Sequence, residues 1–106
     1  MPISETVLRD AVSPLIEQFH PQRIILFGSQ AWGTAHIKSD VDILVISRFQ
    51  GKRRAMLVEM DRALRGAGLP LELVLLTPEE FERDKNIPGT VARPAWCEGK
   101  VLYHQD

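Results

Sequence analysis

Three short runs rich in leucine, isoleucine and valine set the main constraint on the fold of this chain. They span residues 23–27 (RIILF), 41–47 (VDILVIS) and 71–76 (LELVLL), and turn residues such as glycine and proline lie close to each. Runs of this length and composition are typical of buried β-strands. The shorter run at 100–103 (KVLY) is expected to form a final edge strand.

The segments between these runs carry helix signals. Apolar residues recur at helical spacing after Ser4, and Ser13-Pro14 predicts a break in that first helix before it ends at His20-Pro21. A second helix is expected over 52–64, and a third begins at the capping sequence TPEE of 77–80. A short fourth helix is expected within 90–96. Alternating strands and helices indicate an α/β or α+β domain with one sheet.

Length and composition limit what this fold can do. The chain has 106 residues, and we expect one domain over residues 1–106. The formal charge of −1 gives no overall attraction to nucleic acid or anionic lipid, so neither is an expected partner. No apolar run has the ~20 residues of a membrane span. One cysteine, Cys97, excludes a disulfide framework and suits a reducing cytoplasm; we expect it to be buried.

Two acidic residues stand at the start of the second strand. Asp40 and Asp42 are two residues apart, so their side chains point to the same side. Two carboxylates this close repel each other and raise each other's pKa, unless a cation lies between them. Mg²⁺ prefers hard oxygen ligands of this kind and completes its coordination with water and phosphate oxygens. The pair therefore indicates a magnesium site.

Two further features extend this site. Glu72 is the one charged residue in the run 71–76, and it faces the aspartates if the second and third strands are neighbours. Three carboxylates can hold two metal ions ~4 Å apart, as in phosphoryl transfer. Gly28 and Ser29 follow the first strand, and backbone N–H groups there can bind a phosphate; Gly33 lets this segment turn back.

Each of these features also has a simpler structural explanation. Gly28-Ser29 can form an ordinary turn, Asp40 and Asp42 can solvate a loop, and Glu72 can lie on an uncovered face of the sheet. The combination is more specific than its parts, because all the elements occur in one order and at short spacing.

The joint pattern resembles a known family. Gly28-Ser29, ten intervening residues and Asp40-Val41-Asp42 give GS-x10-DxD, the signature of minimal nucleotidyltransferases of the DNA polymerase beta superfamily. Gly33, and Ser39 before the first aspartate, also fit. The resemblance implies a polymerase-beta-like fold, with a small mixed sheet backed by helices and a site on its open face.

The resemblance also implies roles for individual residues. Asp40, Asp42 and Glu72 are the expected catalytic and metal-binding residues, for two Mg²⁺ ions. The expected nucleotide-binding residues, which would hold ATP, are Gly28, Ser29, Gly33 and Ser39. Glu72 stands where aspartate is common and Gln30 where many relatives carry arginine. These two departures put full activity in question.

The implied function is transfer of AMP from ATP to a hydroxyl of a partner protein. Short members of this family resemble antitoxins that pair with a helical HEPN-type ribonuclease toxin, so the expected partner is such a toxin and the expected location is the cytoplasm. One alternative is a weakly active or inactive binding module that neutralises its partner by complex formation. Another is a small-molecule nucleotidyltransferase. A metal-dependent glycosyltransferase also uses Asp-x-Asp, but it gives no reason for Gly28-Ser29.

Overall fold

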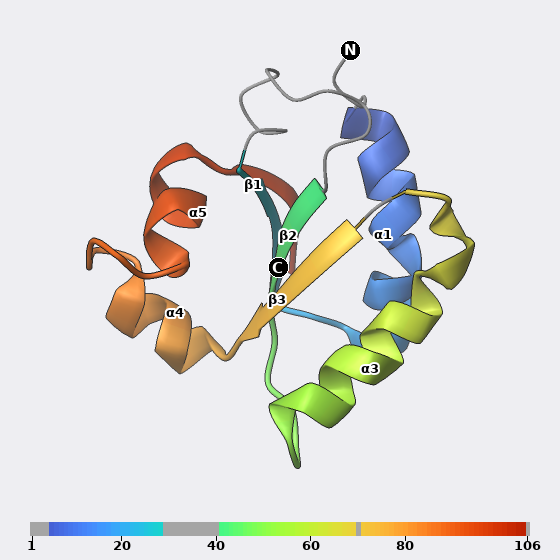
Figure 1. Cartoon of the computed structure of the whole chain (residues 1–106), viewed down its shortest axis with the longest axis horizontal. Helices are drawn as coiled ribbons and strands as arrows, with labels where there is room; N and C mark the ends of the chain where they lie inside the picture. The colour runs from blue at the N-terminus through green and yellow to red at the C-terminus, as the bar shows by residue number, and fades with distance from the viewer. Residues whose placement is uncertain (1–4, 29–40, 70, 106) are drawn as a thin grey trace.

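A computed structural model describes residues 5–28, 41–69 and 71–105, and these form one mixed four-stranded sheet with helices on both faces (Figure 1). The helices are α1 (Glu5–Phe19), α3 (Arg53–Ala63), α4 (Pro78–Asp84) and α5 (Ala92–Glu98), with a 3₁₀ turn η1 (Arg65–Ala67). The strands are β1 (Arg23–Phe27), β2 (Val41–Ile46), β3 (Leu71–Leu76) and β4 (Lys100–His104). The predicted fold class and all four predicted strands are confirmed.

The strand order in the sheet is β3-β2-β1-β4. β1 pairs with both β2 and β4 in antiparallel orientation, whereas β2 and β3 are parallel and in register over six consecutive pairs. The register of β1 against β4 shifts between Ile24 and Ile25, which marks a bulge. The second and third strands are therefore neighbours, which is the condition under which Glu72 faces the same side as Asp42.

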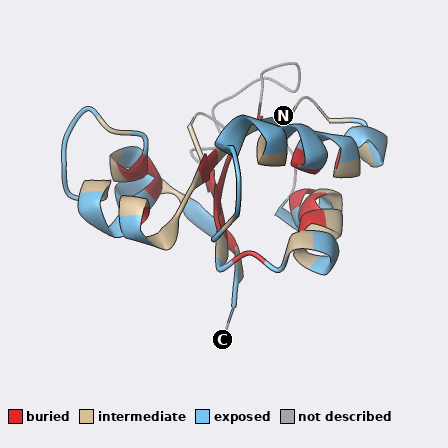
Figure 2. Cartoon of the chain, turned by 90° about the horizontal axis from the view of Figure 1, so that it is seen from below, coloured by how far each residue is buried: buried red, intermediate tan, exposed pale blue. Residues whose placement is uncertain are grey.

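The sheet separates two apolar cores (Figure 2). Residues 41, 43 and 45 of β2 pack with α1 and α3 on one face, in a cluster that includes Leu8, Leu15 and Met60. Residues 44 and 46 pack with α4 and α5 on the other face, in a cluster that includes Phe81 and Ala95. This division follows the two-residue repeat of a strand, because successive side chains point to opposite faces. A strand that is buried on both faces explains the nearly continuous apolar sequence of β2.

Helix α1 is unbroken, so the predicted interruption at Ser13-Pro14 is wrong. Proline has no N–H, and residue 14 therefore cannot donate to the carbonyl oxygen of Asp10 one turn earlier. The Ser13 hydroxyl donates to that oxygen instead, at 2.9 Å. The lost backbone bond is replaced locally, and the buried residues Leu8, Val12 and Leu15 keep one continuous face against the sheet.

The predicted capping sequence before α4 is confirmed. The backbone N–H of Glu80 donates to the Thr77 hydroxyl at 3.1 Å, and the Thr77 N–H donates to a Glu80 carboxylate oxygen at 2.9 Å. Pro78 occupies the first helical position, where a missing N–H costs nothing. This reciprocal cap fixes the point at which the chain leaves β3 and α4 begins.

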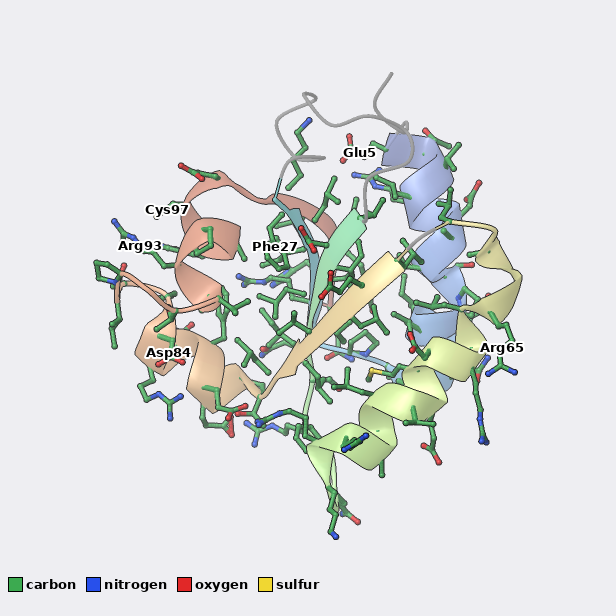
Figure 3. The ribbon with its side chains drawn as sticks, in the orientation of Figure 1. Glu5, Phe27, Arg65, Asp84, Arg93 and Cys97 are labelled. Carbon is green, nitrogen blue, oxygen red and sulfur yellow. The ribbon has the colours of Figure 1, made fainter. Side chains whose placement is uncertain are left out.

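Cys97 is exposed, so the expectation that it is buried is wrong. Ala92 and Ala95 are the buried residues of α5, and helical geometry then turns residue 97 away from the sheet. Figure 3 shows Arg93 and Cys97 on the outer side of this helix. No helix among the described residues is long and apolar enough to cross a membrane.

Candidate active site

The best candidate site begins at the second residue of β2. Asp42 pairs with Phe27 of β1 on one side and with Glu72 of β3 on the other. Residues paired directly across neighbouring strands point to the same face, and strands lie about 4.8 Å apart. Phe27, Asp42 and Glu72 thus form one row across the end of the sheet. Asp42 is half-buried and Glu72 is exposed.

The row lies on the face of the sheet that α4 and α5 cover lower down. Phe27 and Val74 pack against the α4/α5 cluster, whereas Val41 and Leu71 belong to the opposite cluster with α1. In Figure 3, Phe27 lies at the end of β1, between α5 and the sheet. Asp42 and Glu72 are therefore brought together at one end of a covered face.

Gly28 sits directly against the Asp42 carboxylate. Its φ is +77°, in the left-handed region that favours glycine. A Cβ atom at this position would overlap with Oδ2 of Asp42 and lie 3.3 Å from its carboxyl carbon. Only glycine therefore fits both this backbone conformation and this close approach.

Several predicted site residues lie outside the described part of the chain. These are Ser29, Gly33, Ser39 and Asp40, together with Gln30. The described residues contain no group of three or more acidic, histidine or cysteine side chains able to hold a metal ion. Within the described ranges, the predicted acidic set is thus represented by Asp42 and Glu72.

The chemistry of these two residues fits a divalent cation. Carboxylate oxygens on one face of neighbouring strands supply the hard ligands that Mg²⁺ takes, and the ion commonly uses only one or two protein carboxylates. Gly28 has no Cβ that would displace the Asp42 carboxylate. The donor set is compatible with a magnesium ion that also carries phosphate oxygens.

Two features of the site were not predicted from the sequence. Gly28 was expected only to bind phosphate, whereas it lies directly against Asp42. Phe27 had no predicted role, and it is the apolar residue at one end of the row. Both features follow from the register of β1 against β2, which places residue 27 opposite residue 42.

A separate surface cavity lies at the other end of the sheet, near the end of β2. Its volume is about 170 Å³. Its lining residues are Phe19, His20, Gln22, Ser47, Arg48, Pro78 and Gln105. Neither Asp42 nor Glu72 contributes to it, so it is distinct from the acidic row.

Comparison with known families identifies the class of protein. The family described as a nucleotidyltransferase domain matches residues 8–95, which is most of the chain. The chain therefore belongs to the nucleotidyltransferase domain family. A search of curated proteins gives no match.

Two solved structures share the fold. One is a toxin-antitoxin crystal structure with AMP-PNP, which is 23% identical, has a TM-score of 0.64, and matches over 98% of this chain and 76% of that chain. The other is a protein from Sulfolobus solfataricus assigned as a nucleotidyltransferase. It is 18% identical, has a TM-score of 0.66, and matches over 95% of this chain and 80% of that chain. At these identities the likeness shows the shared fold and does not show that this chain has the neighbours' ligands or partners.

Proposed function

We propose that this protein is a Mg²⁺-dependent nucleotidyltransferase that transfers AMP from ATP to a hydroxyl of a partner protein. The observation that carries the proposal is the row of Asp42 and Glu72 on one face, with Gly28 against the Asp42 carboxylate. The family assignment of residues 8–95 supports the reaction class. In this proposal residues 1–106 form one domain that acts in the cytoplasm.

The toxin–antitoxin role is supported by one of the structural neighbours. That toxin-antitoxin structure contains AMP-PNP, and its match covers 98% of this chain. We therefore propose that this protein is the antitoxin of such a pair and that its partner is a helical HEPN-type ribonuclease toxin. The toxin would supply the acceptor hydroxyl.

The proposed mechanism assigns a task to each site residue. The backbone N–H groups at Gly28 and Ser29 bind phosphate oxygens of the nucleotide, with Gly33 and Ser39 shaping the same segment. Asp40, Asp42 and Glu72 would hold two magnesium ions, which when bound neutralise phosphate charge and stabilise the transferred group. Glu72 accepts the proton of the acceptor hydroxyl. The hydroxyl oxygen forms a bond to the α-phosphorus as the bond to pyrophosphate breaks.

A transfer assay tests this function. The protein is incubated with α-labelled ATP, Mg²⁺ and the product of the adjacent gene, and label on either protein is measured. Asp42→Asn is expected to reduce transfer by about 10²-fold or more, since it removes a charged ligand at the reacting group. Glu79→Gln serves as the matched control. Glu79 is a carboxylate on the exposed surface of α4, so this substitution should leave transfer unchanged.

Two results would contradict the enzymatic proposal. One is the absence of transferred label with the wild-type protein, and the other is equal transfer by Asp42→Asn. The second candidate function, a binding module without catalysis, is favoured by the exposure of Glu72 and by its longer side chain where aspartate is common. It predicts that Asp42→Asn still binds and silences the toxin.

A further inference from the structure

Strand β3 is an open edge of the sheet. It pairs with β2 through six consecutive residues without a bulge, and the described residues contain no strand on its other side. In Figure 1, β3 is the strand nearest to the viewer, and no labelled helix or strand lies in front of it. Its apolar residues Leu71, Leu73 and Val74 are half-buried, whereas Leu75 is buried.

The backbone groups of β3 that face outward can be identified from one hydrogen bond. The N–H of Ser47, after β2, donates to the carbonyl oxygen of Leu76 at 3.0 Å, so the backbone of Leu76 points toward β2. Alternation along the strand then turns the backbone of Leu73 and Leu75 outward. The Leu71 N–H already donates to Leu69, at 2.9 Å. Leu75 is only 1% exposed, so its outward N–H is covered. Leu73, which is half-buried, therefore presents the N–H group to which another strand could bind.

The two edges of the sheet differ in how they are protected. β4, at the opposite edge, carries a bulge and the exposed polar residues Lys100 and His104, which are features that discourage pairing with a further strand. β3 has a regular register, no proline and one charged residue, Glu72. An apolar edge of this kind is a template for β-strand addition.

The position of Glu72 decides which strand the edge suits. An added strand would place one residue opposite Glu72, with its side chain on the same face and its Cβ about 4.5–5.5 Å away. That residue would continue the row of Phe27, Asp42 and Glu72 outward. A side chain at this position is the direct neighbour of Glu72, which in turn neighbours Asp42, so the edge is continuous with the candidate active site.

We infer that the acceptor polypeptide binds as an extended strand along β3, and that its residue opposite Glu72 carries the hydroxyl that receives AMP. This inference rests on the proposed function and specifies its substrate as an extended hydroxyl-bearing segment rather than a helix or a small molecule. The acceptor oxygen bonds to the α-phosphorus, pyrophosphate leaves, and the hydroxyl proton passes to Glu72. A second copy of this chain on the same edge is the competing occupant.

Amide hydrogen exchange followed by NMR tests strand addition without requiring catalysis. The probe is a short synthetic peptide in which threonine and valine alternate around a central tyrosine. Its control is the same peptide with methyl groups on the backbone nitrogens that would face β3. Bound peptide is expected to slow exchange at Leu73 by about tenfold or more, because its amide gains an acceptor.

His104 provides an internal control on the other edge. The N–H of Gln105 donates to the Gln22 carbonyl oxygen at 2.9 Å, so the His104 N–H points away from β1. Its exchange should not change with either peptide. Slower exchange at Leu73 with the unmodified peptide alone supports the inference.

Three outcomes would overturn the inference. One is unchanged exchange at Leu73 in millimolar peptide, and another is equal protection by the methylated peptide. The third is protection in the free protein together with a dimer mass in sedimentation, which would assign the edge to a second copy. The transfer assay is read separately. If the peptide slows amide exchange but no AMP is transferred, the proposed function is wrong. If AMP is transferred but the peptide does not slow exchange, only the inference of strand addition is wrong.

Discussion

At the scale of single residues, the contact between Gly28 and Asp42 is the most constrained point of the candidate site. The glycine has a positive φ and no space for a Cβ beside the carboxylate. Asp42 is half-buried at the start of β2, so a displacement there changes the position of a group that we propose binds metal. The backbone conformation of Gly28 therefore determines where the Asp42 carboxylate can lie.

Gly28→Ala is expected to lower the free energy of unfolding and to reduce nucleotide transfer. The matched control is Gly51→Ala, since Gly51 has a φ of +78° but no atom within 4 Å of its Cβ position. Both substitutions cost about 1–2 kcal/mol for the left-handed conformation. Only Gly28→Ala adds the overlap with Asp42. Urea unfolding of both variants measures the difference, and equal losses would show that the contact is unimportant.

At the scale of elements, the strands were predictable because their apolar runs are short and well bounded. The continuity of α1 was not, because the Ser13 hydroxyl that replaces the bond lost at Pro14 depends on side-chain geometry. The site was predictable in part. The shared face of Asp42 and Glu72 depended on strand order, and the approach of Gly28 depended on the register of β1 against β2. Neither order nor register can be read from residue spacing alone.

The stability that the cap of α4 contributes depends on pH through Glu80. The pKa of Glu80 is lowered from its ordinary value of 4.5, first by the hydrogen bond from the Thr77 N–H and further by Arg53, whose Nη2 lies 2.6 Å from Oε2. A carboxyl whose pKa is lowered by folding stabilises the protein above its unfolded pKa. That contribution is lost as the pH falls through the folded value.

Glu80→Gln is expected to remove this pH dependence while keeping a side-chain acceptor for the cap. We expect a loss of about 0.5–1 kcal/mol at pH 7 that becomes smaller as the pH falls below 4.5, measured by urea unfolding over a series of pH values. Glu79→Gln is the control, because Glu79 is exposed and its pair with Arg48 is a surface ion pair. A similar pH effect in both variants would contradict the assignment to the cap.

At the scale of the whole molecule, the sheet connects the acidic row to both cores. β2 contributes Val41 and Ile43 to one cluster and Leu44 and Ile46 to the other. A ligand that binds at Asp42 therefore binds only when both layers are assembled. Binding to the folded state alone raises its stability by mass action.

AMP-PNP with Mg²⁺ is accordingly expected to raise the thermal midpoint by several degrees. At 100 times the dissociation constant the gain is about 2.7 kcal/mol, which is a large share of the stability of a chain this size. Chelation of the metal by EDTA, or the substitution Asp42→Asn, should abolish the shift in a calorimetric scan. An equal shift in the presence of EDTA would show that the nucleotide binds without the metal.

The exposure of Cys97 has a practical consequence. It is the single thiol of the chain, and it points away from the sheet on the outer side of α5. A maleimide dye or nitroxide spin label would attach at one defined position without engineering of the wild-type sequence. Since Ala92 and Ala95 hold the opposite side of α5 against the sheet, such a label would report approach of other molecules to this layer while leaving the acidic row chemically intact.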